Sequence, residues 1–120
     1  PVDSDQPNIN SCLINKYRDG TDSIRPHRDS PESFGETPTI LVFSVGETRS
    51  LDFKQIIYNP SNMASLKQDQ TSTHNFSYEL EDNSLFIMSG ASQKYFTHGI
   101  PKSDTYKQRY SLTLREYLYK

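Results

Sequence analysis

Three side chains in this chain could bind a single metal ion: His27, Asp29 and, far downstream, His98. Two histidines and one carboxylate form a facial set of ligands that leaves positions open on a non-haem Fe(II) ion, where oxygen chemistry can occur. Arg109 and Arg115 follow the second histidine in the run RYSLTLR, and guanidinium groups suit the carboxylates of a dicarboxylic co-substrate. If these residues converge in space, the sequence predicts an oxygenase.

Short strands separated by turn signals are the elements expected to position these residues. Helical periodicity is weak, and many short strands without helices predict a mainly β sandwich or small barrel. Strands are expected over residues 11–17, 23–29, 39–45, 49–53, 76–80, 85–88, 94–98 and 109–117. The turn at Gly46-Glu47 is expected to join the third and fourth of these as a hairpin. Residues 54–75 are polar and irregular, and a loop that long is usually functional or mobile.

Strand alternation predicts that the candidate site residues share faces, because successive side chains point to opposite sides of a strand. His27 and Asp29 are expected to point the same way. In the last strand, Arg109, Ser111 and Arg115 share a polar face. Two arginines on one interior wall are costly to bury unless an anion pairs with them. A bound dicarboxylate would supply that negative charge.

The opposite face of the last strand is apolar. It carries Tyr110, Leu112 and Leu114, and we expect it to pack outward against a core layer. In the first strand, Asn15 and Tyr17 share a face. Both side chains can donate hydrogen bonds to a carboxylate that Arg109 also binds.

The chain of 120 residues is expected to form one domain, residues 1–120. It begins at Pro1 and ends soon after Arg115, which suggests a piece of a longer protein. Hydrophobic residues make up only 32%, but aromatic residues make up 12%, and large rings can build a core from few residues. The net charge of -2 provides no overall attraction for nucleic acid, so such binding would need a local patch.

Cys12 is the single cysteine, so no internal disulfide can form. This indicates a reducing intracellular compartment, the cytoplasm or the nucleus, which also suits Fe(II). Cys12 lies in the apolar run CLI and is expected to be a buried structural thiol. No apolar run approaches membrane-spanning length, so no membrane association is expected.

Six strings in fixed order resemble the AlkB family of Fe(II)/2-oxoglutarate dioxygenases. They are NSCLINKYRDG, PHRD, TILVFSVGETRSLDF, SLFIMSG, YFTHGIP and RYSLTLR, and they extend from about residue 10 to residue 115. The resemblance implies a double-stranded β-helix, or jelly-roll, catalytic core. It also implies that the N-terminal part of the family fold, which holds the nucleotide-recognition lid, is absent from this chain.

The resemblance also implies a role for each candidate residue. His27, Asp29 and His98 match the Fe(II) ligands of the family. The positions that match its 2-oxoglutarate contacts are Asn15, Tyr17, Arg109, Ser111 and Arg115. Ser111 stands where the family often has asparagine. The implied cofactors are Fe(II), the co-substrate 2-oxoglutarate and O2, with no catalytic residue beyond the metal centre.

The function that the resemblance implies is oxidative demethylation of N-alkylated bases in DNA or RNA, with release of formaldehyde, succinate and CO2. The base would have to be single-stranded or flipped out of a duplex. An alternative is an oxygenase that hydroxylates or demethylates a protein or a small molecule. Pro31 favours this alternative, because many family members have an acidic residue there that helps to read the base. A third possibility is a non-catalytic jelly-roll binding module.

Overall fold

The computed structural model describes residues 8–62, 65–72 and 74–119. Within these residues the chain forms short strands and two helices of four residues each. In order they are β1 (Ser11–Tyr17), β2 (Ile24–His27), α1 (Pro31–Phe34), β3 (Ile40–Gly46), β4 (Arg49–Gln55), β5 (Phe76–Leu80), β6 (Ser84–Met88), α2 (Ser92–Tyr95), β7 (Phe96–Ile100) and β8 (Arg109–Arg115). Among the described residues, no helix has the length and apolar character needed to cross a membrane.

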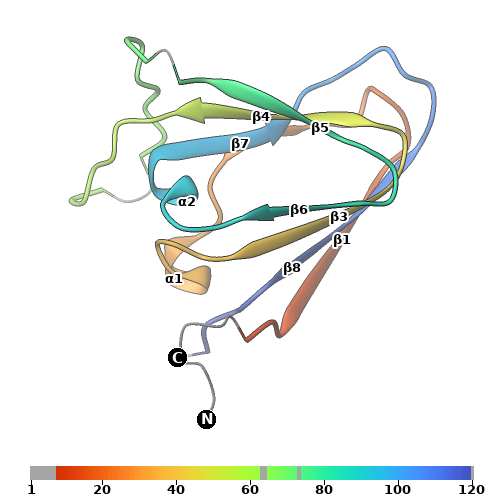
Figure 1. The fold of residues 1–120 in the computed structure, drawn as a ribbon. Coiled ribbons are helices and arrows are strands. Elements are labelled where there is room, and N and C mark those ends of the chain that lie inside the picture. Colours follow the sequence, from red (N-terminus) through yellow and green to blue (C-terminus); the bar gives the residue numbers. More distant parts are fainter. Residues whose placement is uncertain (1–7, 63–64, 73, 120) are drawn as a thin grey trace.

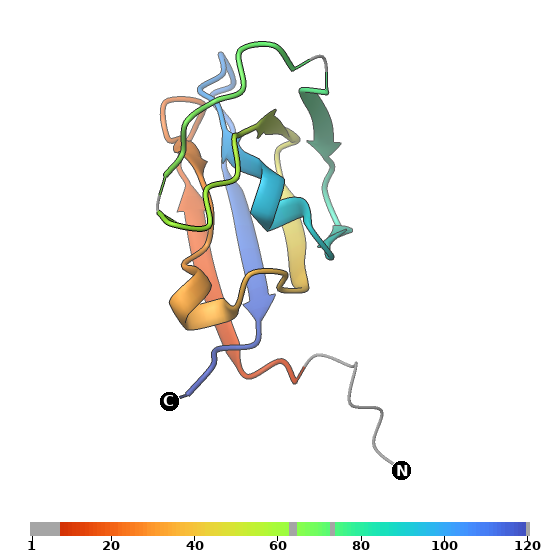
Figure 2. The same cartoon turned by 90° about the vertical axis from the view of Figure 1, so that its left-hand side faces the viewer.

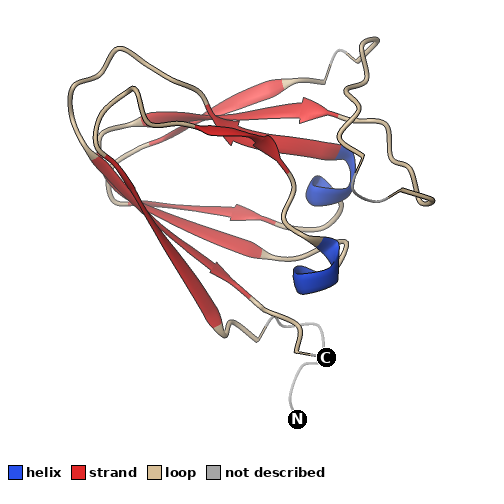
Figure 3. Ribbon diagram, turned by 180° about the vertical axis from the view of Figure 1, so that it is seen from behind, coloured by secondary structure: helices blue, strands red, loops and turns tan. Residues whose placement is uncertain are grey.

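The strands form two antiparallel sheets, with the orders β1-β8-β3-β6 and β2-β7-β4-β5. Figures 1 and 3 show the two sheets as facing layers, with α1 and α2 at one end. Buried side chains from both layers meet between them, among them Ile40, Leu51, Leu80 and Met88. The structure therefore confirms the predicted mainly β jelly-roll core.

The predicted hairpin of residues 39–45 and 49–53 is wrong. β3 pairs with β6 and β8, whereas β4 pairs with β5 and β7 in the other sheet. The turn at Gly46, whose φ is 102°, therefore carries the chain from one layer to the other. A local turn signal fits both a hairpin and such a crossover, and here the distant strands β6 and β8 occupy both edges of β3.

Several predicted boundaries also differ from the structure. Between the expected strands 23–29 and 39–45 the chain forms α1, which begins with Pro31 at its first position, where a missing N–H costs nothing. Lys94 belongs to α2 rather than to a strand, and β7 begins at Phe96. β2 ends at His27, so Asp29 lies beyond the strand.

The outer face of the sheet β1-β8-β3-β6 is apolar and exposed. Ile14, Leu85 and Ile87 are each more than half exposed, so the described residues do not provide the core layer that we expected over this face. Cys12 lies on β1, an edge strand, and is exposed. The prediction of a buried thiol is therefore wrong, because an apolar neighbourhood in sequence does not cover the outer side of an edge strand.

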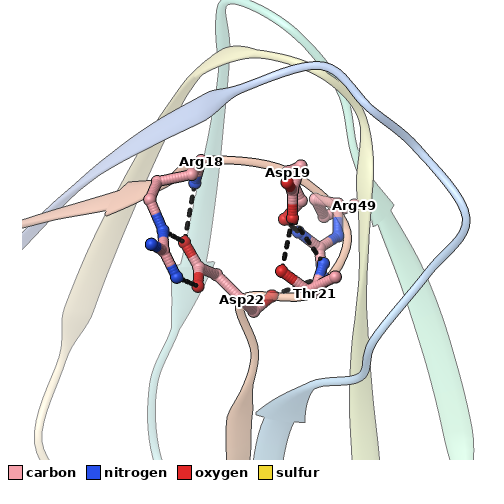
Figure 4. Close-up of polar contacts among 5 residues, drawn as sticks. All are labelled: Arg18, Asp19, Thr21, Asp22 and Arg49. Atoms are coloured by element: carbon pink, nitrogen blue, oxygen red, sulfur yellow. Dashed lines mark hydrogen bonds and ion pairs between the residues drawn. The ribbon is translucent and has the colours of Figure 1, made fainter.

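Hydrogen bonds and an ion pair hold the turn between β1 and β2 at the end of the molecule opposite α1 and α2 (Figures 1 and 4). The Arg18 guanidinium donates to both carboxylate oxygens of Asp22 at 2.9 and 2.8 Å. Asp19 accepts a hydrogen bond from the backbone N–H of Thr21 at 2.8 Å. Arg49, which is buried, donates to the carbonyl oxygens of Asp19 and Asp22. These bonds tie the start of β4 to the turn that leads into β2.

Candidate metal centre and anion-binding cavity

His27, Asp29 and His98 come together at one end of the sheet β2-β7-β4-β5. His27 lies directly opposite His98 in the strand register, with ring centroids 4.3 Å apart. Nε2 of His27 lies 3.7 Å from Oδ1 of Asp29, and Nε2 of His98 lies 3.9 Å from the same oxygen. The structure therefore places the three predicted ligand residues around one point.

His27 is held with one ring nitrogen free. Its Nδ1 donates to the backbone carbonyl of Arg25 at 2.9 Å, so its Nε2 keeps a lone pair that faces Asp29. This is the usual arrangement of a metal-binding histidine, because a hydrogen bond at one ring nitrogen fixes the orientation of the other.

Asp29 is positioned by two partners rather than by strand alternation. Its backbone N–H donates to Oε1 of Gln93 at 2.9 Å. Its Oδ2 accepts a hydrogen bond from Nη1 of Arg115 at 2.8 Å, which leaves Oδ1 toward the histidines. The side chains of His27 and Asp29 converge as predicted, but the predicted reason is wrong because β2 ends before Asp29.

Gln93 is a site residue that the sequence analysis missed. It is 3% exposed, and its Nε2 lies 3.4 Å from Nδ1 of His98. The Gln93 carboxamide therefore contacts both Asp29 and His98. Nothing in the local sequence pattern indicates this role, because Asp29 is 64 residues away along the chain.

His98 is in a neutral form at physiological pH. Burial, and then the nearby His27, lower the pKa of His98 to about 4. A neutral imidazole is the form that binds a metal ion. The donor set of two imidazoles and one carboxylate oxygen therefore fits Fe(II), for which it is the known facial arrangement.

A cavity of about 110 Å³ lies beside the three residues, between the two sheets. Arg109, at the start of β8, lines the cavity and is 1% exposed. Its Nη2 donates to Oγ of Ser44 at 2.8 Å, whereas its Nε and Nη1 are buried and have no hydrogen-bond partner among the described residues. Because a buried cation with unpaired donors is costly, this guanidinium is suited to receive an anion.

The other predicted anion-binding residues line the same cavity. These residues are Asn15, Tyr17, Ser111 and Arg115. Tyr17 lies opposite Arg109 in the strand register, and Asn15 lies opposite Ser111. Tyr17 is 4% exposed, and its burial raises the pKa of its hydroxyl, which therefore stays protonated as a hydrogen-bond donor.

Arg115 lines the same cavity as the candidate metal-binding cluster, which consists of His27, Asp29 and His98. Its guanidinium donates to Asp29, and its Cζ lies 4.1 Å from the ring centroid of Phe34 in α1. Its Nε is buried without a partner. α1, which lies between two expected strands where no helix was predicted, thus supplies an aromatic face that packs against this arginine.

The chain is similar in sequence to several known proteins. Residues 3–115 match the model of the 2OG-Fe(II) oxygenase superfamily. The chain is 35% identical over 108 residues to the alpha-ketoglutarate-dependent dioxygenase alkB homolog 3 of Mus musculus, with 89% of this chain and 36% of that protein covered. It is 33% identical to the Homo sapiens protein of that name, with the same shares covered. It is 28% identical to the DNA oxidative demethylase ALKBH2 of Arabidopsis thaliana, with 78% of this chain and 33% of that protein covered.

The chain spans about a third of the length of the curated relatives it matches. The aligned part includes the metal-binding cluster and the cavity, because the family match runs from residue 3 to residue 115.

Proposed function

The chain belongs to the 2OG-Fe(II) oxygenase superfamily, and from this membership we propose that it is a dioxygenase that demethylates N-alkylated bases of single-stranded or flipped-out DNA or RNA. Fe(II), with 2-oxoglutarate and O2, supplies the oxidation of a C–H bond of the alkyl group while 2-oxoglutarate becomes succinate and CO2. The hydroxylated N-methyl group then leaves as formaldehyde. The names of the relatives support this substrate class, since one of them is a DNA oxidative demethylase.

The protein's own residues hold and orient the reactants in this proposal. His27, Asp29 and His98 would bind Fe(II), and Arg115 would keep one Asp29 oxygen away from the metal through their 2.8 Å hydrogen bond. Arg109 would bind the distal carboxylate of 2-oxoglutarate. Asn15, Tyr17 and Ser111 line the cavity around that carboxylate.

One observation carries the proposal. A metal-binding cluster and a buried arginine with two unpaired donors border the same cavity. Either feature alone would fit a structural metal site or a simple anion site. Together they provide adjoining places for a metal ion and for a dicarboxylate.

Succinate formation tests the dioxygenase chemistry. The protein would be incubated with Fe(II), ascorbate and 2-oxoglutarate, and succinate would be measured for wild type, His27→Ala and the control His74→Ala, which changes an exposed histidine. We expect succinate from wild type and from the control, and its loss in His27→Ala. Absence of succinate from wild type would leave the third possibility, a non-catalytic binding module.

Formaldehyde release tests the substrate class. N-methylated single-stranded DNA and RNA would be compared with a methylated peptide. The net charge of -2 and Pro31 favour the second candidate, a protein or small-molecule substrate. Release from the peptide but not from either nucleic acid would establish this second candidate instead.

We also propose that the chain is one domain of a longer protein and acts in a reducing intracellular compartment. The exposed thiol of Cys12 supports a reducing compartment, because a lone accessible thiol and Fe(II) are both sensitive to oxidation.

A further inference from the structure

A row of four aromatic rings crosses the sheet β2-β7-β4-β5 from the metal-binding cluster to the sheet edge. In the strand register, His27 lies opposite His98, His98 opposite Phe53, and Phe53 opposite Phe76. The neighbouring ring centroids are 4.3, 6.2 and 4.9 Å apart. The row therefore connects the two histidines to β5, the edge strand of this sheet.

At this edge the row widens into a cluster of rings. The Phe76 ring lies 5.6 Å from Tyr78 and 5.4 Å from Phe96, and Tyr78 lies 5.1 Å from Phe86 of β6. β5 and β6 are edge strands of opposite sheets, and Figure 1 shows them diverging from the turn that joins them. The cluster therefore bridges the two layers along this edge of the molecule.

Two rings of the cluster are exposed although they point inward. Phe76 and Tyr78 are 41% and 51% exposed, whereas Leu80, on the same face of β5, is 2% exposed. Phe53, their neighbour in the row, is 4% exposed. Phe76 and Tyr78 thus form an accessible aromatic wall that is continuous with the metal-binding cluster. Grouped exposed apolar side chains of this kind mark binding sites.

Building on the proposed function, we propose that Phe76 and Tyr78 stack against an unpaired base of a single-stranded nucleic acid, next to the base whose alkyl group is oxidised. Two strand spacings, about 10 Å, separate Phe76 from His98. The exposed rings therefore lie beside the neighbouring base rather than over the alkylated one. Stacking on aromatic rings is tolerant of base identity, so this wall contributes affinity without reading sequence.

The charged residues around Phe76 and Tyr78 indicate where the phosphates of the bound strand would lie. Glu79 and Glu81 follow Tyr78 toward the β5–β6 turn, and their carboxylates repel phosphate. Lys94 lies in α2, which ends just before Phe96. Its Nζ lies 4.5 Å from the Tyr58 ring centroid, and its pairing with Glu36, at 3.8 Å, is loose. We expect the phosphate backbone to run along the end of β5 away from Glu79 and Glu81, the end at which Phe96 of β7 contacts Phe76. Figure 2 shows α2 at the end of the molecule that faces the viewer.

Binding of labelled oligonucleotides tests the proposal without relying on turnover. Fluorescence anisotropy would give the Kd of a single-stranded DNA that carries one N-methylated base, and of the same strand with abasic sites on either side of that base. The variants are Phe76→Leu/Tyr78→Leu, which removes both rings, and Tyr78→Phe, which removes only the Tyr78 hydroxyl and retains both rings. Tyr106→Leu is the matched control, because Tyr106 is 85% exposed and lies outside the cluster.

We expect the double leucine variant to bind the intact strand about 5- to 150-fold more weakly than wild type. Tyr78→Phe and Tyr106→Leu should bind like wild type, and the affinity for 2-oxoglutarate should be unchanged in every variant. The flanking abasic sites should weaken binding to wild type but not to the double variant. That loss of sensitivity would show that the rings contact the neighbouring base.

The failures of the two proposals can be told apart. If wild type demethylates and binds the strand but the double variant binds it equally well, the aromatic wall is not the base site and the proposed function stands. If wild type releases formaldehyde only from a methylated peptide, nucleic-acid demethylation fails and the proposed occupant of the wall fails with it. A change in sedimentation of the double variant, with no change in oligonucleotide Kd, would assign the wall to contact with a second copy of the chain.

Discussion

The Arg115 side chain contacts the candidate metal ligand Asp29 and also lines the cavity that contains Arg109. It donates to Oδ2 of Asp29 and packs against Phe34, so it fixes which Asp29 oxygen faces the histidines. We expect Arg115→Gln to weaken metal affinity about 10- to 100-fold, as is typical when a partner of a metal ligand is lost. Titration with Co(II), followed by its visible absorbance, measures this affinity. An unchanged affinity would mean that Asp29 is held sufficiently by Gln93.

Arg109 has opposite effects on the stability of the free protein and on ligand binding. Its guanidinium is buried with two unpaired nitrogens, which is unfavourable until an anion arrives. We expect Arg109→Met to raise the Tm of the ligand-free protein and to weaken 2-oxoglutarate binding roughly 10- to 150-fold, the effect of losing a charged hydrogen bond. Thermal unfolding with and without 2-oxoglutarate tests both parts. A lower Tm in the absence of ligand would show that Arg109 already has a stabilising partner.

His98 should make the stability of the metal-free protein depend on pH. Burial, followed by the nearby His27, holds the pKa of His98 at about 4 in the folded state, against 6.5 ordinarily. The unfolded chain therefore takes up a proton before the folded one does, so stability is fully present above pH 6.5 and falls as the pH drops toward 4. Between pH 4 and 6.5, the Tm of the metal-free His98→Asn variant should depend less on pH than the Tm of wild type. The Tm of His74→Asn should depend on pH as the wild-type value does. The same dependence of Tm on pH in wild type and in both variants would contradict the conclusion that His98 causes it.

At the scale of the elements, the contact between β2 and β7 positions the two histidines. A Cβ on Gly99 would lie 2.8 Å from the carbonyl oxygen of Ile24 and 2.9 Å from the backbone nitrogen of Pro26. The pairing of these strands is irregular between Ile24 and His27, so β2 needs this close approach to place His27 opposite His98.

We therefore expect Gly99→Ala to push β2 away from β7. The free energy of unfolding should fall by about 1–3 kcal/mol, the usual cost of overpacking, and metal affinity should fall with it. Denaturant unfolding and metal titration measure the two effects. Gly90→Asn is the control: a Cβ added at Gly90 meets no atom within 4 Å, and asparagine tolerates its φ of 61°. A stable Gly99→Ala protein with normal metal affinity would contradict this view.

At the scale of the whole molecule, the two sheets divide the site between them. The two candidate metal ligands His27 and His98 belong to β2 and β7 of one sheet, whereas the residues around Arg109 belong to β1, β3 and β8 of the other. The site therefore exists only when the layers face each other. None of the described residues between β4 and β5 belongs to the cluster of buried side chains between the sheets, although Ile56 is itself 3% exposed.

The segment between β4 and β5 offers a test of how substrate turnover depends on a peripheral loop. The backbone N–H of Ile57 donates to the Lys67 carbonyl at 2.9 Å, and Ile56 forms a bridge with Gln68, so residues 59–65 can be deleted without breaking this stem. We expect the deletion to impair turnover of the methylated substrate and to spare 2-oxoglutarate binding. Calorimetry and formaldehyde release measure the two quantities. Unchanged turnover would show that the loop has no part in holding substrate.

The sequence by itself indicated the candidate metal ligands, the alternation that turns Arg109 and Ser111 inward, and the family, because all three depend on residue type and short-range spacing. Only the tertiary structure decided that β3 and β4 lie in different sheets, that Gln93 contacts both Asp29 and His98, and that Cys12 is exposed. It also decided that Asp29 reaches the site from beyond a strand, and that Phe76 and Tyr78 are 41% and 51% exposed among the described residues. Each of these depends on which distant strands meet and which edges stay open, and local propensity does not record either.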